Sequence, residues 1–224
     1  MQQRISDFFS RNRKFIPLMS TALLALVAYG IGAYLYPGMR NPQVFFNLFR
    51  NSSYLLISGI GMTFVILTGG IDLSVSGVVA LTTVASAVLL REGWNAWVVI
   101  LLMLGMGMGL GAIMGTFIVK LKVQPFIATL AGMWFARGMC FFISDDAVQI
   151  NDRIFKILGK TKLLIPGLRE VAVSQGTSAP YIDIPVVVAF MLLIVAVYIA
   201  QYTRFGRTVY AIGGNEAGMN SLPV

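Results

Sequence analysis

The chain has 224 residues, of which 57% are hydrophobic and 12% are charged, and its mean hydropathy is +0.80. Soluble domains carry about 25% charged residues, so these values indicate a polytopic membrane protein and argue against a water-soluble globular core. The net charge of +8 does not indicate a nucleic-acid partner, because Lys and Arg gather at the cytoplasmic ends of membrane helices and at lipid headgroups.

Missing residue types exclude several kinds of chemistry. The sequence has no histidine and a single cysteine, Cys140. These counts exclude a His/Cys metal site, an internal disulfide and a nucleophile of the Ser-His-Asp or Cys-His type. The sequence also lacks a GxxxxGK[ST] motif, so the chain does not bind ATP through a P-loop. We expect no catalytic residues, no metal and no cofactor.

A basic, cytoplasmic N-terminus is expected over residues 1–14, followed by a membrane span over residues 15–36. The apolar run is longer than the 7–15 residues of a signal-peptide core, which indicates a retained helix. Pro37 and Gly38 end it, and residues 41–50 are typical of a short amphipathic stretch on the far side. Cations before the span place the N-terminus inside. They are Arg4, Arg11, Arg13 and Lys14.

Two short apolar segments follow, over residues 53–68 and 75–90, with Gly69-Gly70 between them. One helix over both would be about 57 Å long, nearly twice the hydrocarbon thickness, so the chain has to turn at the glycines. Asp72 is the only ionisable residue from Ser53 to Leu90. A carboxylate in such a stretch indicates a functional site, and a glycine-broken join is expected beside a transport pathway. The alternative is a polar turn at the membrane surface, in which Asp72 caps the second helix.

Three further spans are expected, over residues 96–119, 123–144 and 182–201. Glycines at four-residue spacing in the first of them predict close helix packing. They are Gly105, Gly107, Gly109, Gly111 and Gly115. Arg137 lies about two turns from the predicted outer end of its span, where its side chain can snorkel outward, so we do not pair it with Asp72.

A periplasmic loop over residues 145–181, with a short helix around Arg153–Leu158, precedes the last span, and a cytoplasmic loop over residues 202–224 follows it. Short regions predicted inside hold more Lys and Arg than those predicted outside, which supports both ends in the cytoplasm. The inside cations beyond the N-terminus are Lys120, Lys122, Arg204 and Arg207, and the outside ones are Arg40, Arg50 and Arg91. The predicted fold is an all-α membrane helical bundle with about six transmembrane segments.

Three stretches together resemble signature segments of the permease subunits of bacterial sugar ABC importers, in the ribose/xylose/galactose branch. They are GMTFVILTGGIDLSVSG (61–77), VQPFIATLAGMWFARG (123–138) and TRFGRTVYAIGGNEAG (203–218). The sequence is most similar to galactofuranose-type permeases. Its first stretch departs from the usual GGIDLSVG by Ser76, which precedes Gly77. Permeases of this family continue with further spans, so we expect the chain to be a C-terminally truncated part of one.

The resemblance implies a subunit that moves a monosaccharide across the bacterial inner membrane by alternating access. Implied partners are a cytoplasmic ATP-binding subunit, which hydrolyses the ATP, a periplasmic sugar-binding protein, and a second permease subunit that is identical or different. The residues expected to line the pathway are Thr68, Gly69, Gly70, Asp72, Ser74, Pro125 and Thr129.

The last segment, residues 202–224, resembles the loop that docks on the ATP-binding subunit. Its glycines would allow turns around a short helix that begins at Glu216 and is capped by Asn215. The alternative is a basic flank with no partner. The residues implied in docking are Arg204, Phe205, Gly206, Arg207, Gly213, Gly214, Asn215 and Glu216.

A second class of function stays open beside this one. Intramembrane carboxylates often bind coupling ions, so the chain would also suit an ion-coupled secondary transporter with Asp72 as the ion site. Dependence on an ATPase or on an ion gradient distinguishes the two. An intramembrane hydrolase would need a nucleophile and a base, and the missing histidine disfavours it.

Overall fold

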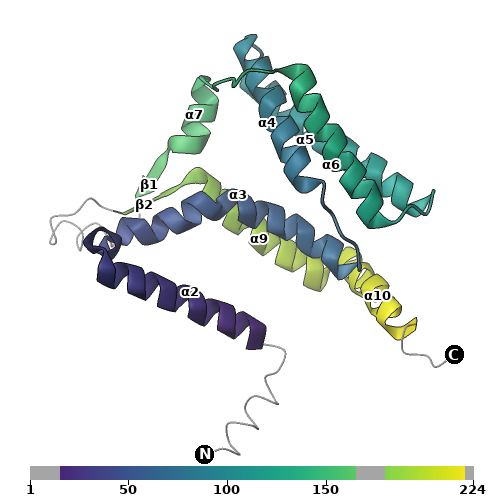
Figure 1. Ribbon diagram of the computed structural model, residues 1–224, viewed down its shortest axis with the longest axis horizontal. Coiled ribbons are helices and arrows are strands. Elements are labelled where there is room, and N and C mark those ends of the chain that lie inside the picture. Colours follow the sequence, from purple (N-terminus) through teal and green to yellow (C-terminus); the bar gives the residue numbers. More distant parts are fainter. Residues whose placement is uncertain (1–15, 165–179, 220–224) are drawn as a thin grey trace, which may run out of the picture. The chain divides into compact units, whose positions relative to one another are not determined.

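The computed structural model describes residues 16–164 and 180–219, with side chains as far as Gly214. The regular secondary structure of the described part is helical apart from one two-stranded sheet, formed by β1 (Lys162–Leu164) and β2 (Tyr181–Asp183). The all-α prediction is confirmed. The helices are α2 (Ile16–Leu35), η2 (Pro37–Arg40), α3 (Pro42–Leu67), α4 (Val75–Arg91), α5 (Ala96–Val119), α6 (Pro125–Ile143), α7 (Arg153–Lys160), α9 (Ile184–Tyr202) and α10 (Arg204–Met219) (Figure 1).

Four of the described helices, α2, α5, α6 and α9, are long and apolar enough to cross a membrane. Helix α4 is apolar but has only 17 residues. Helix α3 has 26 residues, and its length of about 39 Å exceeds the hydrocarbon thickness of a bilayer. The predicted N-terminal segment 1–14, residues 165–179 of the predicted periplasmic loop and residues 220–224 lie outside the described residues. The number of crossings and their orientation stay predictions.

The chain divides into two compact units, residues 1–49 with 164–181 and residues 50–163 with 182–224. In the first unit, η2 folds back on the end of α2. Arg40 Nε donates a 2.9 Å hydrogen bond to the Ala33 carbonyl, and the Tyr29 hydroxyl donates one of 3.2 Å to the Met39 carbonyl. Both bonds satisfy carbonyls at the turn, where a helix end leaves acceptors without helical partners.

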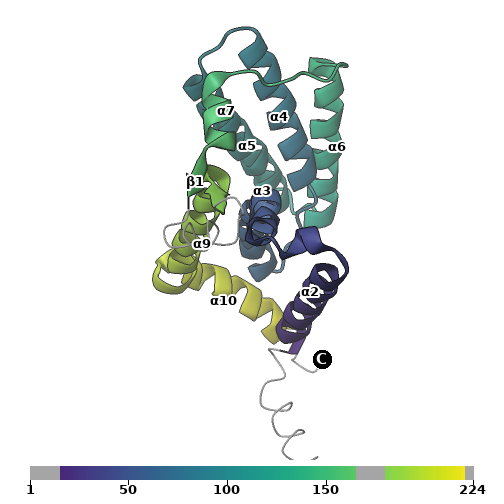
Figure 2. The same cartoon turned by 90° about the vertical axis from the view of Figure 1, so that its left-hand side faces the viewer.

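In the second unit, α4, α5 and α6 lie side by side (Figures 1 and 2). Gly77 of α4 is buried, and a Cβ at this position would lie 2.7 Å from the Met133 carbonyl oxygen of α6. Only glycine allows this approach of the two backbones. Small residues of both helices, including Ala85 of α4 and Ala128 of α6, are also buried. The structure differs from the packing predicted for α5, because a Cβ on Gly105, Gly109, Gly111 or Gly115 would meet no described atom within 4 Å.

Helix α3 corrects a further expectation. The amphipathic stretch over residues 41–50 is not separate from the next predicted span, since one helix runs from Pro42 to Leu67. Asn41 starts this helix, because its Oδ1 accepts a 2.9 Å hydrogen bond from the Gln43 amide. Proline at the first helical position needs no amide partner, so Asn41-Pro42 forms a regular helix start. The Asn-Pro pair was the available sequence signal.

Candidate transport site

The join between α3 and α4 is broken at the predicted glycines. Gly69 has a φ of +78°, which a side chain disfavours. Its amide donates to the Ile66 carbonyl at 3.0 Å, and the Gly70 amide donates to the Val65 carbonyl at 3.0 Å. These two bonds are those of a Schellman motif, which ends a helix by satisfying its last carbonyls. The glycine-broken join is confirmed, and residues 68–74 carry the chain between the helices.

Asp72 lies half-buried in this join. Its Oδ1 accepts hydrogen bonds from the Ser74 amide at 2.7 Å and from the Ser74 hydroxyl at 2.6 Å. Ser74 is the N-cap residue of α4, and its own side chain makes no capping bond. The carboxylate therefore fixes the turn that leads into α4 through the N-cap residue itself. The alternative of a polar turn at the membrane surface stays open. Among the described residues, only Oδ1 of this carboxylate has hydrogen-bond partners.

Thr129 brings α6 to the same join. Its side chain is buried, and its hydroxyl lies 2.8 Å from the Pro125 carbonyl and 3.3 Å from the Ile71 carbonyl. The hydroxyl thus bridges the first turn of α6 and the residue before Asp72. Thr68 directly follows α3, and its hydroxyl donates to the Val65 carbonyl of the last helical turn at 2.8 Å. The structure brings Asp72, Ser74 and Thr129 to one place, and their role in a pathway stays a prediction.

The structure differs from the turns and the helix cap predicted for residues 202–224, and the docking role of this segment stays a prediction. The chain is continuously helical from Arg204 to Met219, so Asn215 lies inside a helix and caps none. Gly206 and Gly213 allow close backbone approach and do not form turns. A Cβ on Gly206 would overlap the Ala200 carbonyl oxygen of α9, and a Cβ on Gly213 would overlap the Leu67 carbonyl oxygen of α3. Backbones that approach so closely exclude any side chain at these positions.

The remaining predicted docking residues lie before and after Gly206 and Gly213 along α10. Arg204, Phe205 and Arg207 are exposed, and Gly214 would meet nothing within 4 Å if it carried a Cβ. The Phe205 ring lies 5.9 Å from the Phe64 ring of α3, measured between centroids. Glu216 belongs to the same helix by its backbone, and its side chain lies outside the description. Helix α10 therefore packs on α9 and approaches the last turns of α3, and both of its arginines are exposed.

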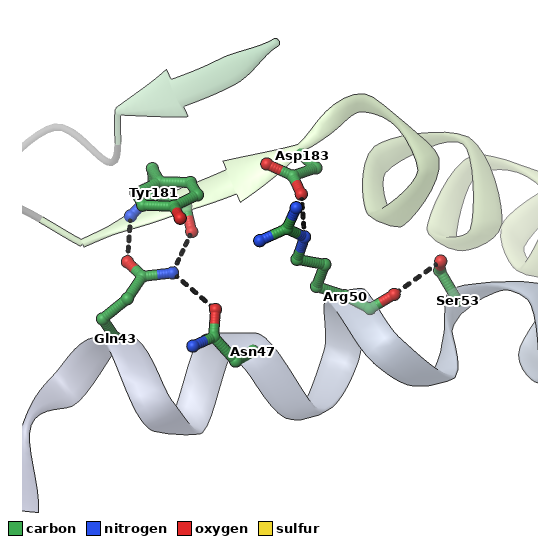
Figure 3. A network of polar contacts seen from close by, with 6 residues as sticks. All are labelled: Gln43, Asn47, Arg50, Ser53, Tyr181 and Asp183. Carbon is green, nitrogen blue, oxygen red and sulfur yellow. Dashed lines mark hydrogen bonds and ion pairs between the residues drawn. The ribbon is translucent and has the colours of Figure 1, made fainter. Parts of the chain in front are cut away.

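A polar network at the other end of α3 was missed by sequence reasoning (Figure 3). Gln43 Oε1 accepts from the Tyr181 amide at 2.8 Å, and Gln43 Nε2 donates to the Tyr181 carbonyl at 3.3 Å and to Asn47 Oδ1 at 3.0 Å. The side-chain amide thus pairs with β2 as a neighbouring strand would. In the second unit, Arg50 Nε lies 2.5 Å from Oδ2 of Asp183.

Asp183 is 1% exposed, and apart from this ion pair neither of its carboxylate oxygens has a hydrogen-bond partner among the described residues. The residue is the N-cap of α9, but Pro185 removes one of the amides that a capping side chain would bind. The carboxylate depends on Arg50 for compensation of its charge. Opposite charges at the predicted outer ends of two spans were the available sequence signal.

Four apolar membrane-length helices, together with a glycine-broken join beside a carboxylate, define a helical membrane protein. The chain belongs to the family described as "Branched-chain amino acid transport system / permease component", whose model matches residues 44–222. The members of this family are permease components rather than catalytic subunits. No solved structure is significantly similar to the chain.

Curated relatives match nearly the whole chain. The inner membrane ABC transporter permease protein YjfF of Escherichia coli K12 is 34% identical over 95% of this chain and 61% of its own length. The fructose import permease protein FruG of Bifidobacterium longum is 34% identical over 96% and 63%. The galactofuranose transporter permease protein YtfT of E. coli K12 is 28% identical over 99% and 65%. The chain spans less than two thirds of the length of these relatives.

Proposed function

We propose that this chain forms part of the membrane-spanning permease of an ATP-driven monosaccharide importer. The observation that carries the proposal is its similarity, over nearly its full length, to permeases named for fructose, ribose and galactofuranose. The proposed protein resides in the bacterial inner membrane with its N-terminus in the cytoplasm. It acts with a separate ATP-binding subunit that hydrolyses ATP, a periplasmic sugar-binding protein and a second permease subunit.

The join residues suit the passage of a neutral, hydroxyl-rich solute. A sugar needs hydrogen-bonding groups rather than a strong charge along its path. The Asp72 carboxylate, the Ser74 hydroxyl and the carbonyls of the unwound segment supply acceptors and donors in one place. The Ser74 bonds leave Asp72 Oδ2 available to accept from a sugar hydroxyl. We assign to these groups, with Thr68, Gly69, Gly70, Pro125 and Thr129, the lining of part of the pathway.

Helix α10 is the proposed docking element for the ATP-binding subunit. Its exposed Arg204 and Arg207 are available to a partner, while Gly213 abuts the carbonyl of Leu67, the last residue of α3. A displacement of α10 would therefore press on α3 directly before the Gly69 turn. Rigid helices that meet at a flexible turn can transmit a movement in this way. ATP hydrolysis outside this chain would reach the pathway through that contact.

The proposal is tested by ATP-dependent uptake of labelled monosaccharides into vesicles containing the complete importer. We expect Asp72→Ala to abolish uptake while the protein still inserts, because the pathway loses its carboxylate. Asp145→Ala is the matched control, since Asp145 is exposed at the end of α6, away from the join. Uptake that is retained in Asp72→Ala would remove this residue from the mechanism. Uptake that needs an ion gradient instead of ATP would favour the secondary-transporter alternative.

Docking is tested separately by capture of the ATP-binding subunit in detergent. Arg204→Gln/Arg207→Gln should weaken capture, because the exposed cations of α10 are lost. Lys120→Gln/Lys122→Gln removes the same charge from another exposed basic site that is predicted to be cytoplasmic. Equal capture by both variants and by the unmodified protein would contradict the assignment of α10. Deletion of residues 202–224 measures the contribution of the whole segment.

A further inference from the structure

The Arg50–Asp183 ion pair joins α3 to α9 at the predicted outer ends of two spans, and neither the proposed pathway nor the docking helix uses it (Figure 3). The contact runs from Arg50 Nε to Asp183 Oδ2, and neither carboxylate oxygen makes a hydrogen bond with a described residue. Charged groups bind most strongly through paired, well-aligned hydrogen bonds. The Arg50 side chain is also 43% exposed, so water can solvate the cation when the contact breaks. The ion pair is therefore a contact that can be released.

Asp183 is directed at α3, although it stands where an aspartate normally binds its own helix. Asp152, at the same N-cap position of α7, accepts hydrogen bonds from two first-turn amides of that helix at 2.8 and 3.0 Å. The Asp183 side chain makes no such capping bond, and Pro185 lacks one of the amides. A buried carboxylate without local hydrogen bonds is costly, and an apolar side chain would occupy the position more stably. The charge at position 183 thus serves the contact with Arg50 rather than the start of α9.

The packing of α3 and α9 differs along their length. Within these two helices the buried residues are Ser53 of α3 and Val186 and Ala189 of α9, and all three lie within two turns of the ion pair. Toward the opposite ends of the helices, a cavity of about 170 Å³ lies between α3, α9 and α10. Its lining includes Ile60, Phe64, Leu193, Val197 and Tyr210. The helices are therefore buried beside the ion pair and hollow between their other ends.

This arrangement gives the two helices room to rock against each other. Closing the cavity would bring the inner ends of α3 and α9 together and would part their outer ends. New dispersion contacts across the cavity would compensate in part for the broken ion pair. A movement of α10 can reach the pair, because α3 runs without a break from Arg50 to Leu67, whose carbonyl abuts Gly213 of α10.

We infer that the Arg50–Asp183 pair is a latch that holds the outer ends of α3 and α9 together and opens during each transport cycle. The inference rests on the proposed function, in which the ATP-binding subunit moves α10. Charged residues suit a latch, because they attract each other when closed and are hydrated when open. An apolar pair would stay closed, since opening would expose it to water.

The first test joins the two helices covalently in the complete importer. Arg50→Cys/Asp183→Cys with Cys140→Ser has its only cysteines at the latch, because Cys140 is the single cysteine of the sequence. A short, reducible bis-thiosulfonate then links the two positions. We expect cross-linking to lower ATP-dependent uptake of labelled monosaccharide at least about tenfold, and dithiothreitol to restore it. Asp183→Cys with Cys140→Ser, treated in the same way, is the control and should lose no uptake on treatment.

The second test separates a latch from a structural support. Arg50→Met/Asp183→Leu leaves no unpaired buried charge, so its unfolding free energy should stay close to that of the unmodified protein. We expect its uptake to fall about fivefold, because the apolar contact opens less readily. Arg50→Lys keeps the charge and should retain most of the uptake.

Three outcomes would overturn the inference. Full uptake by the cross-linked protein would show that the outer ends do not separate, and would reject the latch alone. Full uptake by a stable Arg50→Met/Asp183→Leu variant would make the pair a support of the fold. An unmodified importer without ATP-dependent uptake would reject the proposed function together with the latch.

Discussion

The two ends of α3 are fixed by different kinds of contact. At its first turns, side chains reach across to β2 and the start of α9, through Gln43–Tyr181 in one unit and Arg50–Asp183 in the other. At its last turn, backbone meets backbone, because Gly69 turns the chain and Gly213 of α10 abuts the Leu67 carbonyl. The first end depends on charge and hydrogen bonding, and the last end depends on the absence of side chains.

The difference has consequences for how each end responds to change. A polar contact is lost when one partner is removed, and what remains is an unsatisfied group whose cost depends on its burial. A close backbone contact does not depend on any side chain, so removing a side chain elsewhere leaves it intact. An added methyl group on one of its glycines, however, forces the helices to shift. At the first end, the destabilising substitutions should therefore be those that remove a polar group. At the last end, they should be those that add a side chain to a glycine.

The largest effect is expected from Arg50→Ala. The substitution leaves the buried Asp183 carboxylate without its cation, and removal of one partner of a buried pair costs about 3–5 kcal/mol. We expect about 3 kcal/mol of lost unfolding free energy, at the low end because the Arg50 side chain is 43% exposed. Denaturation in mixed detergent micelles measures it. The double variant Arg50→Met/Asp183→Leu should recover most of the stability, and a double variant as unstable as Arg50→Ala would contradict the ion-pair explanation.

The sequence predicts the last end of α3 better than the first. A glycine pair within a stretch too long for one helix determines a break by geometry alone, and the break lies at Gly69 as expected. The network at the first end depends on residues more than 130 positions apart, Gln43 and Tyr181. Neither hydropathy nor spacing reports which distant polar groups meet, because many pairings satisfy the same pattern.

The sequence also does not show which glycines lie at close contacts between helices. The glycines of α5 have the spacing of a packed interface and meet no described neighbour apart from Gly107, whose added Cβ would lie 3.9 Å from Val78. Gly77 and Gly213 have no such spacing and form the close contacts. Sequence reasoning assigned turns to Gly206 and Gly213, and both lie in a helix because close packing in the fold outweighs the low helix propensity of glycine. Which glycine touches a backbone is decided by the tertiary fold.

An intermediate effect is expected from Gly213→Ala. The new methyl group would overlap the Leu67 carbonyl oxygen, and overpacking of this kind costs about 1–3 kcal/mol. Gly214→Ala is the matched control, since its methyl group meets no described atom and alanine favours the helix by about 1 kcal/mol. The unfolding free energies of the two variants should differ by at least about 2 kcal/mol. Equal stabilities would show that α10 does not pack on α3 at this position.

The smallest effect is expected from Gln43→Leu, which removes the two hydrogen bonds to Tyr181 and keeps the approximate size of the side chain. A typical hydrogen bond contributes about 1 kcal/mol, and the partial exposure of this site lets water replace part of the loss. We expect a decrease of about 1 kcal/mol in unfolding free energy. Gln43→Glu keeps the acceptor for the Tyr181 amide but loses the donor to its carbonyl. Its unfolding free energy should therefore lie between those of the unmodified protein and Gln43→Leu. A loss as large as that of Arg50→Ala would mean that hydrogen bonding, rather than compensation of the Asp183 charge, dominates the first end of α3.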